Sequence, residues 1–131
     1  MRITTWNINS VRLRIGLALK LLDQSKPDVL CLQETKCPDE QFPFEAFRDI
    51  GYKYIAVNGM KAYNGVALIS RVPFESELAL DWTERSDCRH ISGVFPGNIE
   101  IHNFYVPAGG DEPDIETVSY THLRAHETIP D

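Results

Sequence analysis

The segment ITTWNINSVRLRIGLALKLLDQSKPDVLCLQETK, residues 3–36, decides the fold that we predict for this chain. Its first residues, 3–8, alternate enough to form a β-strand. The apolar residues that follow recur at helical spacing and predict an amphipathic helix over residues 11–24, with Leu13, Leu17, Ala18, Leu21 and Leu22 on its apolar face. Lys26-Pro27-Asp28 ends the helix, and the apolar run 29–32 is typical of a strand buried on both faces. Together they predict a βαβ unit with parallel strands.

The rest of the chain predicts strands that are mostly antiparallel. A short helix is expected around residues 45–50, after a stretch that contains two prolines. Five further strands are expected, at residues 52–57, 66–70, 74–80, 91–95 and 99–106. Turn signals separate several of them, at Asn58-Gly59, Asn64-Gly65 and Pro96-Gly97. The sequence therefore predicts an α/β fold rich in antiparallel strands.

Composition is that of a globular protein. The chain has 131 residues, of which 43% are hydrophobic and 24% charged, which suits one domain or a fragment of a larger one. No apolar run approaches the roughly 18 residues that span a bilayer, and no signal peptide opens the chain, so a cytoplasmic location is expected. The three cysteines are odd in number and form no CxxC pair, which argues against a disulfide framework and a zinc site.

The net charge of −6 is unevenly distributed along the chain. Residues 1–36 carry six Lys/Arg against three Asp/Glu, whereas residues 37–131 carry seven against sixteen. An acidic total does not exclude a nucleic-acid partner, because the local field matters and a site for a divalent cation needs carboxylates of its own.

Polar residues at the ends of the first two strands are the first candidates for a site. Asn7 lies where asparagine is uncommon, so its segment is either part of a site or a turn that caps the next helix through Ser10. Glu34 ends the second strand, and because parallel strands end at the same edge, Asn7 and Glu34 could converge on one cleft. A carboxylate beside an amide oxygen suits Mg²⁺, which takes few protein ligands. Lys36 could hold Glu34 ionised or touch a phosphate; otherwise the two form an ordinary surface ion pair.

Five motifs that include these residues follow one another in the chain. They are Trp6-Asn7-Ile8-Asn9, Leu32-Gln33-Glu34-Thr35-Lys36, Tyr63-Asn64-Gly65-Val66-Ala67-Leu68-Ile69-Ser70, Arg89-His90-Ile91 and Asn103-Phe104-Tyr105-Val106-Pro107. In this order they resemble the signatures of the exonuclease III and abasic-site (AP) endonuclease family of the endonuclease/exonuclease/phosphatase superfamily. The resemblance implies a partial domain over residues 1–117, the N-terminal half of a four-layer α/β/β/α sandwich with mixed, mostly antiparallel sheets.

The resemblance also implies a role for each matching residue. Glu34 looks like the family's Mg²⁺ ligand, and Asn7 like the amide that helps to arrange the metal and the attacked phosphate. Tyr105 resembles the tyrosine that contacts the reacting phosphate, although an arbitrary strand-end tyrosine would pack on the sheet. Arg89 matches a position near the DNA backbone, and we group Lys36 with it as a DNA contact; an arbitrary arginine would be solvated.

The activity implied by the resemblance is hydrolysis of a DNA phosphodiester in base excision repair, with Mg²⁺ as cofactor or Mn²⁺ in its place. The metal would stabilise charge on the phosphate oxygens while water attacks phosphorus. The expected partner is double-stranded DNA with abasic sites or 3′ ends, with no membrane involved, and the full-length protein is expected to be a monomer.

The later catalytic motifs of that family are missing from this sequence. It contains no Asp-x-Asn, and none of its four histidines follows an aspartate. We therefore expect the chain as given to be an inactive N-terminal part. Residues 118–131 resemble a translated adapter sequence and are expected not to be natural protein.

Two alternatives remain open from the sequence. The same fold serves phosphatases that act on inositol phosphates, because fold does not fix the substrate. A degenerate copy of the fold could also serve as a non-catalytic module that binds DNA or another partner. The acidic total favours such a module slightly, whereas the presence of both Asn7 and Glu34 opposes it, since binding alone needs no metal carboxylate.

Overall fold

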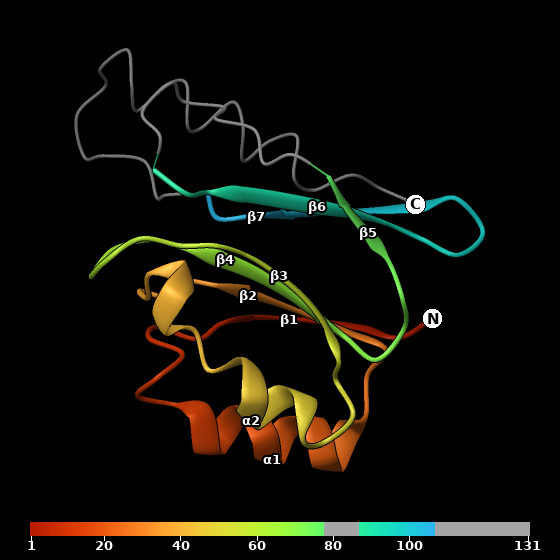
Figure 1. Ribbon diagram of the computed structural model, residues 1–131, viewed down its shortest axis with the longest axis horizontal. Coiled ribbons are helices and arrows are strands. Elements are labelled where there is room, and N and C mark those ends of the chain that lie inside the picture. The colour runs from red at the N-terminus through yellow and green to blue at the C-terminus, as the bar shows by residue number, and fades with distance from the viewer. Residues whose placement is uncertain (78–86, 107–131) are drawn as a thin grey trace.

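The computed structural model describes residues 1–77 and 87–106, which form two β-sheets packed face to face, with helices on the outer face of the larger sheet (Figure 1). The larger sheet has the order β1-β2-β4-β3, with strands Ile3–Asn7 (β1), Val29–Gln33 (β2), Tyr54–Asn58 (β3) and Val66–Ser70 (β4). The smaller sheet has the order β5-β6-β7, with strands Glu75–Glu77 (β5), His90–Phe95 (β6) and Ile99–Phe104 (β7). Among the strand pairs of residues 1–77 and 87–106, β1–β2 is parallel and the others are antiparallel. The predicted mixed α/β fold is confirmed.

Two apolar layers hold these elements together. Between the sheets, the cluster consists of Val29, Cys31, Val66, Leu68, Ile91, Phe95 and Ile101. Between the larger sheet and the helices, a second cluster is centred on Leu30, Leu32, Ala67, Ile69, Ala18, Leu22 and Phe47. Strand β2 contributes alternate residues to both layers, which is why its apolar run is unbroken. The prediction of a strand buried on both faces is confirmed.

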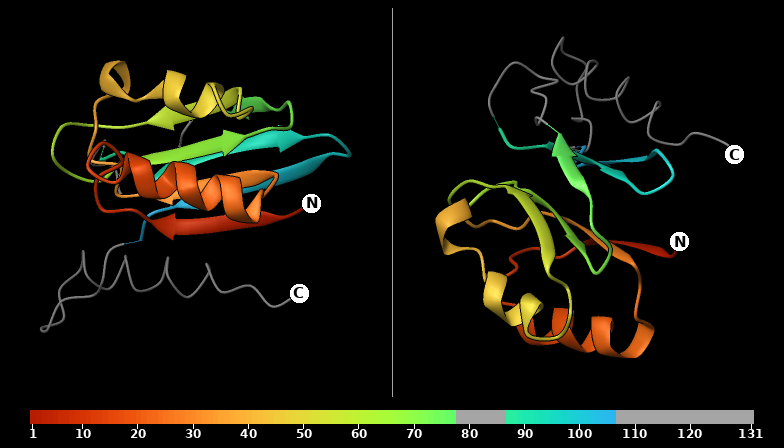
Figure 2. Two further views of the ribbon diagram at one scale, coloured as in Figure 1. Left: turned by 90° about the horizontal axis from the view of Figure 1, so that it is seen from below. Right: turned by 45° about the vertical axis from the view of Figure 1, so that its right-hand side comes forward.

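Both helices lie on the same side of the larger sheet (Figure 2). Helix α1 runs over Ile15–Ser25 and ends at Lys26, whose left-handed backbone (φ +46°) closes the last turn. Helix α2 covers Phe44–Arg48, after a 3-10 turn at Asp39–Gln41. Helix α1 starts later than the sequence predicts, and Ser10 does not cap it: the Ser10 hydroxyl accepts a 3.4 Å hydrogen bond in the preceding turn.

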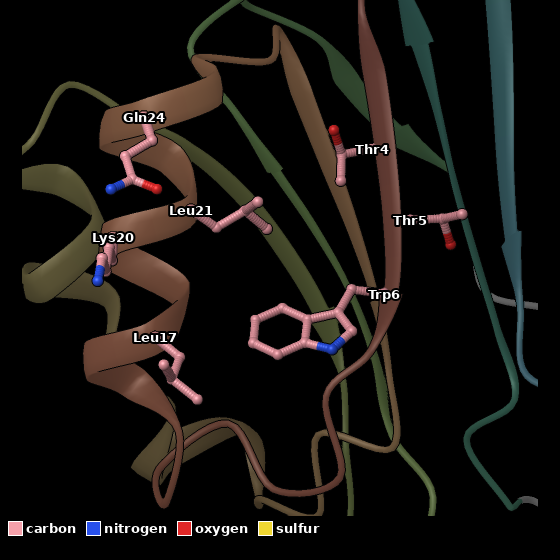
Figure 3. A pocket seen from close by; sticks show the side chains of 7 residues that line it. All are labelled: Thr4, Thr5, Trp6, Leu17, Lys20, Leu21 and Gln24. Carbon is pink, nitrogen blue, oxygen red and sulfur yellow. The ribbon is translucent and has the colours of Figure 1, made fainter.

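The predicted apolar face of α1 is partly wrong. Ala18 and Leu22 are buried, but Leu13 and Leu17 are 76% and 58% exposed. Leu13 precedes the helix, and Leu17 lines an open cavity of about 420 Å³ between α1 and β1, opposite Trp6 (Figure 3). The reason is that β1 is an edge strand of the sheet formed by the described residues, so the side of α1 that extends past β1 has none of these strands to pack on.

The remaining predicted elements agree with the structure to within a few residues. The strand predicted at 74–80 is described as Glu75–Glu77, and residues 78–80 fall outside the described part of the chain. The predicted tail 118–131 also lies outside it. Among the described residues, no helix is both long and apolar enough to cross a membrane.

Candidate functional site

Strands β1 and β2 end side by side at one edge of the larger sheet. Asn7, the last residue of β1, pairs with Gln33, the last residue of β2, and Glu34 follows directly. Strand alternation places Asn7 on the same face as Thr5, whose hydroxyl accepts a 2.9 Å hydrogen bond from the Gln33 side-chain amide. Gln33 also contacts Asn103 of the smaller sheet, so this face points toward the space between the sheets. The predicted juxtaposition of the two strand ends is confirmed.

The Glu34 carboxylate lies at the rim of this space and contacts the smaller sheet. The Tyr105 hydroxyl donates to Glu34 Oε1 at 3.3 Å, across 71 residues of sequence. Lys36 Nζ is 4.0 Å from the same oxygen and donates a shorter, 2.6 Å hydrogen bond to Asn9 Oδ1. Glu34 and Lys36 are therefore more than an isolated surface pair: each is also tied to a second part of the chain.

Tyr105 is held between Glu34 and Arg89. The Arg89 guanidinium carbon lies 5.0 Å from the centre of the Tyr105 ring, a cation–π arrangement. Arg89 Nε in turn donates to Asp87 Oδ2 at 2.5 Å, and both side chains of this pair are largely buried. Burial first, and the neighbouring Glu34 carboxylate second, raise the pKa of the Tyr105 phenol, so the hydroxyl stays protonated at neutral pH and remains a donor. The structure thus brings together Glu34, Lys36, Tyr105 and Arg89 at the strand ends beside Asn7.

The Asn64-Gly65 turn before β4 holds the two segments that carry these residues. The Lys36 N–H donates to the Asn64 carbonyl at 2.9 Å, and the Thr35 N–H donates to the Gly65 carbonyl at 3.1 Å. On its other side, the Asn64 side chain donates to the Asp87 carbonyl at 2.9 Å. The sequence predicts only a turn here. The structure shows that this turn is hydrogen-bonded both to the segment after β2 and to the segment before β6.

Gly65 leaves no room for a side chain. Its φ is +94°, and a Cβ built at this position would lie 2.1 Å from the Thr35 hydroxyl oxygen. Gly65→Ala is therefore expected to lower the free energy of unfolding by about 2 kcal/mol, through backbone strain and the clash. Urea unfolding measures this. Gly16→Ala is the matched control, because nothing lies within 4 Å of a Cβ there, and it should not destabilise the chain. Equal stability of the two variants would contradict the prediction.

Left-handed backbone is concentrated at this edge. Outside glycine, positive φ values occur here at Asn9, Ser10, Glu34, Lys36, Asn64 and Cys88. Such conformations cost on the order of 1 kcal/mol each and collect where a fold aims side chains at a site. At Glu34, φ of +54° ends the strand geometry directly after Gln33.

Sequence reasoning missed the contact between two amides near the site and, away from the site, a hydrogen bond between two histidines. Gln33 and Asn103 are quoted in the motifs, yet nothing in their spacing shows that they bond to each other at 2.7 Å. His102 stacks on His90, and its Nδ1 shares a 2.9 Å hydrogen bond with His90 Nε2. Asn103 shares its strand with Glu100 and His102, so polarity alone could not single it out.

The donor set fits one loosely held hard cation. No group of three or more His, Cys, Asp or Glu residues that could hold a metal occurs in residues 1–77 and 87–106. Glu34 supplies one carboxylate at the rim, 22% exposed, and the Asn7 amide ends the neighbouring strand. Mg²⁺ commonly takes one or two carboxylates and keeps several waters, whereas structural zinc needs four protein ligands. Glu34 and Asn7 therefore fit Mg²⁺ and do not fit zinc.

Comparison with known proteins identifies the family of this chain. The family model described as "Endonuclease/Exonuclease/phosphatase family" matches residues 4–130. Exodeoxyribonuclease III of Haemophilus influenzae is 37% identical over 71 residues, which cover 54% of this chain and 26% of that protein. The chain thus spans about a quarter of the length of this relative.

Solved structures extend the comparison over nearly the whole chain. An AP endonuclease from Archaeoglobus fulgidus superposes with a TM-score of 0.82 at 33% identity, covering 99% of this chain and 52% of that one. The 3′ phosphatase NExo from Neisseria, bound to a product DNA hairpin, gives a TM-score of 0.82 at 32% identity, covering 95% of this chain and 49% of that one. The chain spans about half the length of these two proteins.

Proposed function

The chain belongs to the endonuclease/exonuclease/phosphatase family, and from this premise we propose that it carries the N-terminal part of a Mg²⁺-dependent DNA phosphodiester hydrolase of the exonuclease III and AP endonuclease type. Its relatives and structural neighbours include proteins named as an exodeoxyribonuclease and an AP endonuclease. We propose the activity for a protein of the full length of these relatives, acting on duplex DNA with abasic sites or 3′ ends in base excision repair.

The observation that carries the proposal is the contact between Glu34 and Tyr105. It joins a carboxylate at the carboxyl end of β2 to a protonated phenol from the other sheet, at 3.3 Å, at the rim of the space between the sheets. A purely structural pair has no need of Lys36 and Asn7 at the same edge. Together they offer a carboxylate and an amide oxygen for a cation, and an ammonium and a hydroxyl for an anion.

Each residue then has a distinct task. Glu34 and Asn7 would hold the ion, which when bound supplies charge stabilisation at the phosphate oxygens. The Tyr105 hydroxyl has a single proton, which it donates to Glu34 in this structure; with DNA bound, it would donate that proton to a phosphate oxygen instead. Lys36 adds positive charge for the DNA backbone. Arg89 lies over the Tyr105 ring and is only 15% exposed, so it steadies the tyrosine as well as adding charge near the backbone.

Dependence on a divalent ion tests this proposal directly. The full-length protein is expected to incise an abasic-site duplex in the presence of Mg²⁺, and EDTA should lower the rate at least about a thousandfold. Mn²⁺ in place of Mg²⁺ should restore activity, because both are hard ions with oxygen ligands. Gel analysis of an end-labelled duplex measures all three.

Other outcomes of the same assay would refute the proposal. Binding of the duplex without incision would favour the non-catalytic module, and release of phosphate from an inositol phosphate without cleavage of DNA would favour a phosphatase. A duplex that ends in a 3′ phosphate is a useful additional substrate, because the Neisseria neighbour is named as a 3′ phosphatase. Removal of that phosphate alongside incision would agree with the proposal, since both reactions place a DNA phosphate at the same site.

A further inference from the structure

The two sheets are joined near the site by a chain of side-chain amides. Asn103 of β7 is 3% exposed, and its Nδ2 donates to the Leu32 carbonyl of β2 and to the Ala67 carbonyl of β4, both at 2.9 Å. Its Oδ1 accepts from Gln33 Nε2 at 2.7 Å. Both donors and the acceptor of this buried amide are thus used in contacts with the larger sheet.

Around these hydrogen bonds, the side chains packed between the sheets form an apolar cluster. The cluster there contains valine, leucine, isoleucine, phenylalanine and cysteine side chains, and apolar packing has no preferred direction along a strand. Hydrogen bonds, by contrast, fix both distance and angle. A shift of β7 along β2 would leave a buried amide without its partners, which costs about 1–3 kcal/mol for each group.

The amide chain lies next to the two residues of the candidate site that come from different sheets. Glu34 directly follows Gln33, and Tyr105, the first residue after β7, packs against the apolar cluster between the sheets. The Glu34–Tyr105 contact is 3.3 Å and therefore sensitive to a small shift between the sheets.

We propose that Asn103 and Gln33 are positioning residues: their hydrogen bonds fix β7 against β2 so that the Tyr105 hydroxyl meets the Glu34 carboxylate. The claim that this contact serves phosphodiester hydrolysis rests on the proposed function. The claim that the two amides position the contact is independent of that function. Neither residue touches the reacting phosphate in this scheme. They act through Tyr105 and Glu34.

Nuclear Overhauser spectroscopy on the full 131-residue chain tests the geometry without any activity. In the wild type, a cross-peak is expected between the Tyr105 ring protons and the Glu34 side-chain methylenes. Asn103→Leu removes the whole bridge at similar volume and should abolish this cross-peak. Gln33→Met keeps Asn103 bonded to the two carbonyls, so it folds even if Asn103→Leu does not, and it should weaken the cross-peak.

Asn58→Leu is the matched control. Asn58 of β3 also bridges the sheets, since its Nδ2 donates to the His90 carbonyl of β6 at 2.9 Å, two strands away from β2. Asn58→Leu therefore removes one hydrogen bond between the sheets and should leave the Tyr105–Glu34 cross-peak intact. A wild-type cross-peak in folded Gln33→Met, or an equal loss in Asn58→Leu, would overturn the proposal.

Kinetics of the full-length protein separate this inference from the proposed function. Gln33→Met is expected to lower kcat roughly tenfold to a hundredfold with little change in KM, since it misplaces groups that act in the reaction. An unchanged kcat despite a lost cross-peak would overturn the positioning role. Absence of incision by the wild-type protein would instead refute the proposed function, and the cross-peaks would still decide whether the amides set the contact.

Discussion

Glu34→Ala is expected to lower the rate of abasic-site incision by the full-length protein at least about a thousandfold. The Glu34 carboxylate directly follows β2 at the strand ends, and it also accepts the hydrogen bond of the Tyr105 hydroxyl. If Glu34 holds the cation as proposed, its replacement removes both the cation and the hydrogen-bond acceptor of the Tyr105 hydroxyl. Single-turnover incision rates at saturating Mg²⁺ measure the chemical step.

Two companion variants make this result specific. His102→Ala should keep incision near the wild-type rate, because His102 contacts His90 and Glu100 and not the candidate site. Glu34→Gln keeps the size of the side chain and the bond from Tyr105 while removing the charge, and should lose nearly as much activity as Glu34→Ala if the charge holds a cation. Activity of Glu34→Ala equal to that of the wild type would refute the assignment of the metal ligand.

The sequence predicted the part of the candidate site that is formed by neighbouring segments of the chain. Asn7 and Glu34 end two strands joined by a single helix, and a βαβ connection places the ends of parallel strands at the same edge whatever the details of the loops. The apolar run of β2 likewise predicted a strand covered on both faces, because only burial of both faces permits unbroken hydrophobicity.

The part of the candidate site that depends on the smaller sheet could not be predicted from residue patterns. Tyr105 reaches Glu34 across 71 residues of sequence, and Asn103 reaches Ala67 across 36. Strand alternation says which face a residue occupies but not how far one sheet slides over another. The resemblance to a family named Tyr105 as a candidate without its contact to Glu34, and gave Asn103 no role.

Helix α1 shows that even a local pattern does not determine which residues are buried. Its apolar spacing was correct, yet Leu17 is exposed, because a helix periodicity does not indicate how many strands lie beneath it. Arg89 was predicted from the resemblance to approach DNA, and the structure places it over the Tyr105 ring. In both cases the sequence correctly indicated a residue of interest, but it did not indicate which part of the structure that residue contacts.

Acidification is expected to destabilise the chain through His90. This histidine is fully buried, and burial first and the neighbouring His102 second lower the pKa of its imidazole to about 4. In the unfolded chain the pKa returns to the ordinary histidine value of 6.5, so below that pH the unfolded state binds the proton more readily than the folded state. The contribution of neutral, buried His90 to the free energy of unfolding is fully present above about pH 6.5 and is lost as the pH falls toward 4.

Urea unfolding at pH 7 and pH 4.5 measures this loss, which should be roughly 2–3 kcal/mol from His90 alone. His90→Gln removes the titration and should be less stable than the wild type at pH 7 but lose less stability on acidification. His102→Gln should keep most of the pH dependence, because burial rather than the second histidine is the larger cause of the shift. Carboxylates with lowered pKa, such as Asp28, titrate below this window and are common to all three proteins. Equal acid losses in the wild type and in His90→Gln would show that the buried histidine does not set the acid stability of this sheet.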